Sequence, residues 1–243
     1  QILPSFTIAN DRTRLEVNAF FSERRANDYP GLPPVGTLNT SLFTTPRYLN
    51  PNGTNVPRTV SQRNGAAFLF EQTLTDDWTF RIAGRFTASN MEQPAQYIAG
   101  PPFFGSSFLM GNAYLQQDQT QISVLPTLEG RFTTGPVQHV VLAGMDLDRT
   151  TDTGGMGVGL AGFFDVLNPI QLPYVRPSTS GFRIDNTYST VAGFVQDQLR
   201  WGGLNIVGTL RWTDLTIDSR DATGAGWTSS TTRFTPRIAA GYD

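Results

Sequence analysis

The chain has 243 residues and no cysteine, which excludes disulfide frameworks, thiolate metal sites and cysteine nucleophiles. Its 18 basic residues are all arginine and are matched by 20 acidic ones, so the net charge of −2 argues against a broad nucleic-acid-binding face. No apolar run approaches the roughly 18 residues of a transmembrane helix, but barrel strands are apolar only at alternate positions and pass unnoticed in such a scan.

Alternating apolar and polar residues predict strands from the N-terminus onward. Residues 1–9 and 13–25 are joined by a tight polar turn at Asn10-Asp11, and residues 62–74 and 78–90 by a turn at 75–77. Each stripe is about 9–11 residues long, which is the length of a tilted strand that crosses a bilayer. The first half of the chain therefore predicts four strands.

The second half continues this pattern. Residues 117–133 and 138–151 are joined by Thr134-Gly135-Pro136, and residues 187–200 and 204–219 by Trp201-Gly202-Gly203. A ninth strand is expected at 231–243, where apolar residues alternate with threonine and arginine. Four aromatic residues near strand ends fit the interfacial girdles of a membrane barrel: Trp78, Trp201, Trp212 and Tyr242.

Between the short turns lie long stretches without strand periodicity. They cover about 26–60, 91–116 and 152–186, with a shorter one near 221–230. A compact soluble domain rarely carries several structureless loops of more than about 15 residues. An outer-membrane barrel has short periplasmic turns and long extracellular loops. We therefore expect an all-β fold, an antiparallel transmembrane β-barrel.

Charged residues follow the face opposite the apolar stripe. Because a charged side chain that faces mid-bilayer lipid costs about 2–4 kcal/mol, we expect them to face a wet lumen. In a soluble sheet they would simply face water. Asp146 and Asp148 share one strand face, and we favour pairing with arginines of nearby strands over acid–base chemistry. The expected lumen-facing residues are Arg81, Arg85, Asp146, Asp148, Arg211 and Arg237.

Other chemical motifs are weak. The single histidine, His139, lacks carboxylates at metal-ligand spacing and a placed serine. Residues 157–162 match G-x-G-x-x-G, but Asn168-Pro169 follow where a dinucleotide site needs a helix. We expect no enzyme activity, no catalytic residue, no resident metal and no cofactor.

Five segments, in order, resemble motifs of the TonB-dependent siderophore receptors. They are Gly31-Leu32-Pro33-Pro34-Val35-Gly36-Thr37, the hairpin from Leu128 to Asp146, Phe164-Asp165-Val166-Leu167-Asn168-Pro169, Gly193–Gln198 with Leu210–Asp214, and Phe234–Asp243. Pro34 and Trp212 depart from the usual small residue and tyrosine. The family forms a barrel of about 22 strands around a plug, so the resemblance implies that residues 1–243 are part of such a barrel, with the plug, TonB box and C-terminal strands outside the chain.

The resemblance implies energy-coupled uptake of a ferric siderophore in the bacterial outer membrane. The expected partners are the ferric siderophore, outer-membrane lipid and the TonB complex through parts outside this chain, with no nucleic acid and with iron only inside the siderophore. Aromatic faces suit flat chelating ligands, so we expect ligand contacts from loop aromatics. These are Tyr29, Tyr97, Phe103, Phe104, Phe163, Phe164, Tyr174 and Trp227.

Two other functions stay open. A passive porin-like channel shares the strands and loops but lacks a plug. A soluble all-β module that binds carbohydrate or protein predicts solubility without detergent and loops of more even length.

Overall fold

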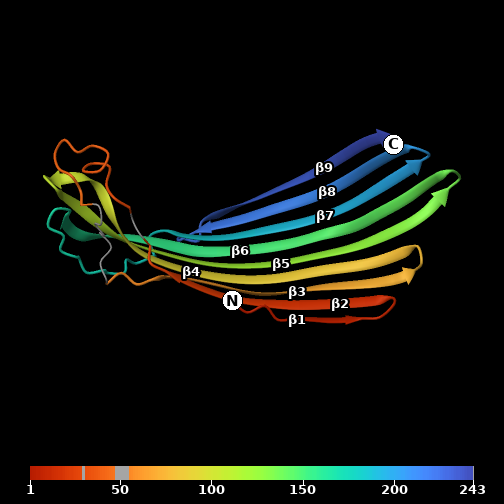
Figure 1. Cartoon of the computed structure of the whole chain (residues 1–243), viewed down its shortest axis with the longest axis horizontal. Coiled ribbons are helices and arrows are strands. Elements are labelled where there is room, and N and C mark those ends of the chain that lie inside the picture. The colour runs from red at the N-terminus through yellow and green to blue at the C-terminus, as the bar shows by residue number, and fades with distance from the viewer. Residues whose placement is uncertain (29–30, 47–54, 243) are drawn as a thin grey trace.

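Each strand pairs with the next one along the chain in antiparallel register, because alternating residues and short turns favour hairpins over crossovers. The computed structural model describes residues 1–28, 31–46 and 55–242, which form one nine-stranded sheet in the order β1 to β9 (Figure 1). The strands are β1 (Ser5–Ala9), β2 (Thr13–Ala26), β3 (Thr59–Thr75), β4 (Trp78–Phe104), β5 (Ser107–Thr134), β6 (Val137–Asp165), β7 (Arg183–Trp201), β8 (Leu204–Asp221) and β9 (Gly226–Tyr242). The predicted nine-stranded antiparallel order is confirmed.

Four short turns gather at one end of the sheet, at the right of Figure 1. Asn10 closes the first turn, where its side-chain Oδ1 accepts hydrogen bonds from the backbone N–H groups of Arg12 (2.9 Å) and Thr13 (2.8 Å). Gly135 and Gly202 have φ angles of 60° and 57° in the β5–β6 and β7–β8 turns, a conformation that favours glycine. The short-turn end is therefore specified by local sequence.

The opposite end differs from expectation. The predicted loop 91–116 is wrong: β4 runs to Phe104 and β5 starts at Ser107, and β6 likewise continues to Asp165. Beyond an apolar band, both faces of a strand meet water or loops, so the apolar–polar alternation fades while the backbone ladder continues. The expected loop at 221–230 shrinks to a turn between Asp221 and Gly226.

The segment 166–182, which we call the strap, lies against β6. An added Cβ on Gly157 would collide with the carbonyl oxygen of Ser178, and one on Gly155 would lie 3.0 Å from Thr179. The strap thus rests directly on the β6 backbone where side chains are missing. This packing accounts for Gly157 of the glycine-rich motif of residues 157–162, and the φ of 133° accounts for Gly162, so neither glycine requires a nucleotide to explain it.

The long strand ends hold a small core. Phe108, Met110, Phe164 and Val166 are at most 1% exposed, and partly buried residues of the 31–46 segment and the strap pack on them. Phe43 meets Phe108 edge-on with ring centroids 6.0 Å apart. The core therefore ties both loops to the β4–β6 extensions.

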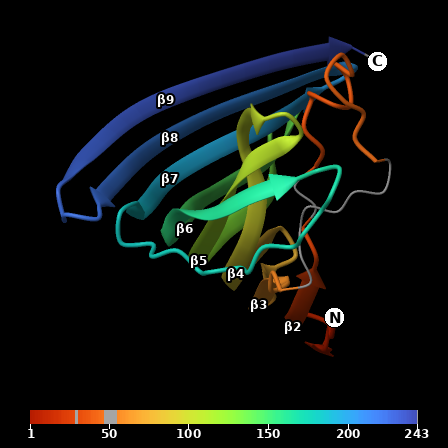
Figure 2. The same cartoon turned by 90° about the vertical axis from the view of Figure 1, so that its left-hand side faces the viewer.

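The sheet has one apolar face and one polar face along its short-turn half. Paired residues such as Phe80, Leu128 and Ala143 lie side by side on the apolar face, and Trp212 pairs with Phe234 on the same face. Seen end-on, the sheet is curved and open, with β9 at one edge (Figure 2). Within the described ranges, no helix is long and apolar enough to span a membrane.

Candidate functional site

The polar face carries an ion-pair cluster at Arg81. Its Nε lies 2.5 Å from Glu71 Oε2 on β3, and its Nη1 lies 2.7 Å from Glu129 Oε2 on β5. Arg131 binds the other oxygen of Glu129 at 2.8 Å. Arg81 of β4 therefore links β4 to both of its neighbours, β3 and β5, on the polar face.

A second ion pair spans two strand spacings. Arg211 Nη2 on β8 lies 2.8 Å from Asp146 Oδ2 on β6, and Arg211 Nε donates to Thr213 Oγ1 at 3.1 Å. Ala192 of β7 stands between Asp146 and Thr213 in the register and is 0% exposed. Its small side chain lets the guanidinium reach across β7.

Asp148 belongs to a row of amides and acids on β5 and β6. Gln121 Nε2 donates to Asp148 Oδ2 at 2.9 Å, and Gln117 Nε2 donates to Asp152 Oδ1 at the same distance. These contacts lie four residues apart along each strand, an even number, and so share the polar face. The row gives this face both hydrogen-bond donors and acceptors.

Arg85 lies in a different arrangement, over an aromatic ring. The Cζ atoms of Arg85 and Arg63 lie 5.8 Å and 5.7 Å from the centroid of Phe20. Both arginines are exposed, and they border a hollow of about 450 Å³ with the N-terminal residues. Arg237 is exposed on edge strand β9, opposite Thr209.

Three of the expected ligand-contacting aromatics come together at the far end of the long hairpins. Phe103 and Phe104 close the tip of β4, with ring centroids 4.9 Å apart, and Phe163 on β6 lies 5.6 Å from Phe103. All three are more than half exposed. Their faces are accessible from outside the chain.

The other five aromatics are not part of this cluster. The prediction that Phe164 contacts the ligand is wrong, because its side chain is 1% exposed and packs in the core. It follows Phe163 on β6 and so points to the opposite face, toward the core. Tyr97 fills the space above Gly111, and Tyr174 donates its hydroxyl to the carbonyl of Ala113 at 3.0 Å. Trp227 is 56% exposed on β9, and Tyr29 lies outside the described residues.

A polar cluster beneath the strap has no counterpart in the sequence-based expectation. Arg176 stacks on Tyr114 with its Cζ 3.6 Å from the ring centroid, and Gln96 donates to the carbonyls of Leu172 and Pro173 at 3.2 Å. Burial raises the pKa of the Tyr114 and Tyr174 hydroxyls, which keeps them protonated. No sequence signal pairs Arg176 with Tyr114, since they lie on segments far apart along the chain.

His139 lies on the apolar face near the short turns. Its Nδ1 is 2.9 Å from Asp197 Oδ2, and its ring stacks on Phe132 at 4.8 Å. Among the residues that the structure describes, no three histidine or acidic side chains cluster in a way that could hold a metal ion.

Comparison with known proteins agrees with this architecture. Residues 4–243 match the family described as TonB dependent receptor-like, beta-barrel. The ferrichrome outer membrane transporter/phage receptor of Escherichia coli (strain K12) is 23% identical over 273 residues, which cover 93% of this chain and 35% of that protein. The chain thus spans about a third of that relative's length.

Solved structures share the fold at low sequence identity. The unliganded ferric citrate transporter FecA superposes with a TM-score of 0.74 at 14% identity, covering 99% of this chain and 33% of that one. The ferric-catecholate import receptor Fiu from K12 E. coli gives 0.74 at 16%, covering 98% and 39%. P. aeruginosa FpvA bound to pyoverdines gives 0.75 at 15%, covering 99% and 33%.

The family and these relatives also agree with three sequence-based predictions. The relatives are receptors and transporters, which confirms the prediction of a non-enzymatic protein. The bacterial outer membrane is confirmed as the location, and the nine strands form an unclosed portion of the family's barrel. The chain belongs to the TonB-dependent receptor-like β-barrel family.

Proposed function

We propose that the protein containing this chain takes up a ferric siderophore across the outer membrane in an energy-coupled step. The observation that carries the proposal is the two-faced sheet of the family's barrel: an apolar face for lipid and a polar face with the Arg81 and Arg211 ion pairs. A charged face of this kind requires water or a polar domain against it. The names of two matched relatives mention ferrichrome and ferric citrate.

The Phe103–Phe104–Phe163 cluster is the proposed first contact for the siderophore. The three rings lie within 6.3 Å of one another, are exposed, and sit at the tips of the long hairpins. Aromatic faces stack well on flat chelating groups. Tyr97, Tyr174 and Trp227 remain weaker candidates, because Tyr97 and Tyr174 are engaged in packing or a backbone hydrogen bond and Trp227 stands on edge strand β9.

The polar face is the proposed lumen wall. Arg63, Arg85 and Arg237 have no carboxylate partner among the ion pairs of the described residues, so they are among the arginines available to a plug or to a passing anionic chelate. Asp148 and Asp152 offer acidic counterparts on β6. The assignment of residues 1–243 to a partial barrel domain belongs to the same proposal.

The test is iron uptake by the complete gene product. It is expressed in a bacterium that lacks its own siderophore receptors, and radioactive ferric hydroxamates, catecholates and citrate are supplied with and without TonB. The proposal predicts saturable uptake of at least one chelate that stops without TonB. Uptake that persists without TonB and does not saturate would favour the passive channel instead.

A further inference from the structure

A carboxylate occupies the apolar face of the sheet. Asp197 of β7 stands in a row with Val141, Gly208 and Ile238, and its neighbours along the strand on that face are Val195 and Leu199. This face of a family barrel meets lipid, where a charged side chain is costly away from the interface. Asp197 lies four residues from Trp201, on the short-turn side of the apolar band.

The carboxylate is only partly satisfied by the protein. Asp197 Oδ2 contacts His139 Nδ1 at 2.9 Å, whereas its Oδ1 is covered and has no hydrogen-bond partner among the described residues. His139 is held by stacking on Phe132 with an interplanar angle of 10°. The side chain of Asp197 is 34% exposed, and the broad χ2 torsion of aspartate allows either oxygen to turn outward.

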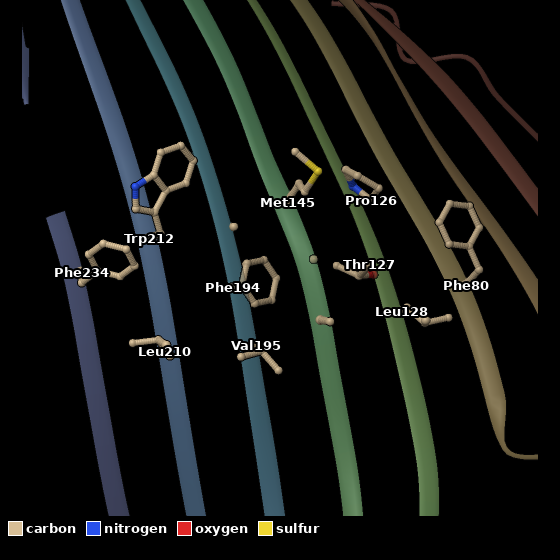
Figure 3. Close-up of a pocket in the computed structure, with 13 residues that line it drawn as sticks. Phe80, Pro126, Thr127, Leu128, Met145, Phe194, Val195, Leu210, Trp212 and Phe234 are labelled. Carbon is tan, nitrogen blue, oxygen red and sulfur yellow. The ribbon is translucent and has the colours of Figure 1, made fainter. Parts of the chain in front are cut away.

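A furrow runs along the same face from Asp197. Val195 and Leu210 line both of two adjoining hollows. One, of about 530 Å³, reaches Asp197 and Ile238. The other, of about 600 Å³, reaches Trp212 and Phe234 and is the one drawn in Figure 3. From Asp197 to Gly193 the furrow covers four residues, roughly 13 Å at about 3.3 Å per residue. The larger hollow also extends across the sheet, from Phe80 on β4 to Phe234 on β9, and its part over β7 and β8 continues along these two strands toward Asp197.

The furrow is open because no neighbouring side chain covers two of its glycines. A Cβ added to Gly193 or Gly208 would meet no atom within 4 Å. By contrast, a Cβ on Gly130 would lie 2.5 Å from the ring of Trp78, and one on Gly84 would collide with Phe68. Neighbouring rings fill the space over those glycines but leave the furrow of β7 and β8 empty.

We propose that this furrow binds a phospholipid with a primary ammonium headgroup, such as phosphatidylethanolamine, from the periplasmic leaflet. The ammonium donates to Asp197, whose charge complements it, and an acyl chain lies over Gly208, Val195 and Gly193. Family barrels have periplasmic short turns, so Asp197 is on the headgroup side and the furrow points toward the bilayer centre. An anionic headgroup such as phosphatidylglycerol lacks the ammonium and is repelled by the carboxylate.

Native mass spectrometry of the complete detergent-solubilised receptor tests this site. Purified receptor is incubated with phosphatidylethanolamine or phosphatidylglycerol of identical acyl chains at equal concentration, and bound lipid per protein is counted. The wild type should retain about fivefold more phosphatidylethanolamine, the ratio expected of one partly screened ionic contact. Asp197→Asn should lower that lipid to the phosphatidylglycerol level, and Gly208→Leu should do the same by filling the furrow.

The matched control is Asp76→Asn, which removes a carboxylate at another short turn where the side chain is 97% exposed. It should bind lipid as the wild type does. Heat-modifiable gel migration checks that each variant is folded, and Gly193→Leu is a second filling variant should Gly208→Leu not fold. Equal binding of both lipids by the wild type overturns the proposal, as does wild-type binding by Asp197→Asn or by a folded filling variant.

Discussion

Arg81 is the residue whose loss should weaken the polar face most. Arg81→Ala leaves Glu71 and Glu129 without their shared partner, and we expect a loss of about 1 kcal/mol of stability once screening at this one-third-exposed site is allowed for. The measurement is the midpoint of heat-induced unfolding of the complete receptor by gel migration. Arg237→Ala, on the same face without an ion pair among the described residues, is the control. Equal midpoints for both variants would refute the role of the cluster.

Single residues also show where sequence reasoning stops. Alternation places Arg81 and Arg211 on the polar face, but the reach of Arg211 across β7 to Asp146 depends on the small Ala192 in a third strand. Alternation puts Phe163 and Phe164 on opposite faces of β6, but Phe164 is the buried one because Phe108, Met110 and Val166 pack on its side. Such outcomes depend on packing between strands that sequence periodicity does not describe.

At the level of elements, the strap depends on missing side chains of β6. Gly157→Val should displace it, because even a Cβ there collides with the carbonyl of Ser178. Gly159→Ala is the matched control, since its Cβ would lie 3.8 Å from Pro177 in ordinary contact. Limited proteolysis should cut residues 166–182 faster in Gly157→Val alone. Equal cutting of both variants and the wild type would contradict the packing.

The β8–β9 turn should respond to acid. Asp221 Oδ1 accepts hydrogen bonds from the Thr223 hydroxyl at 2.7 Å and its N–H at 2.8 Å, and these bonds lower the Asp221 pKa below its usual 3.8. The ionised carboxylate of Asp221 therefore stabilises the turn fully above pH 3.8. This stabilisation is lost as the pH falls through the lowered pKa, because the carboxylate becomes protonated. Amide exchange at residues 222–225, corrected for intrinsic rates, should accelerate there. Asp221→Asn should abolish the pH dependence, and a profile unchanged by this substitution would exclude the mechanism.

Element boundaries were predictable where lipid imposes alternation and not beyond it. The short turns at Asn10, Gly135 and Gly202 follow from local turn chemistry. The sequence did not predict the extensions of β4, β5 and β6, because their residues are not typical of strands. Those in β4 include Pro94, Pro101 and Pro102. Pairing with the neighbouring hairpin maintains them there, which is a tertiary effect.

For the whole molecule, the division into a lipid face and a wet face is the central claim. The absence of cysteine makes it directly testable by single cysteine substitutions along β8 in the complete receptor, with any cysteine elsewhere replaced by serine. Ile206 and Leu210 lie on the apolar face, and Thr209 and Arg211 on the polar one.

The measurement is labelling of these four cysteines in outer-membrane vesicles by a membrane-dissolved and a water-soluble maleimide. We predict that Ile206→Cys and Leu210→Cys react with the lipid-soluble reagent. Thr209→Cys and Arg211→Cys should react with the water-soluble one in urea, which would loosen the proposed plug. Reaction of all four with the water-soluble reagent at equal rates would contradict the membrane barrel and favour a soluble sheet.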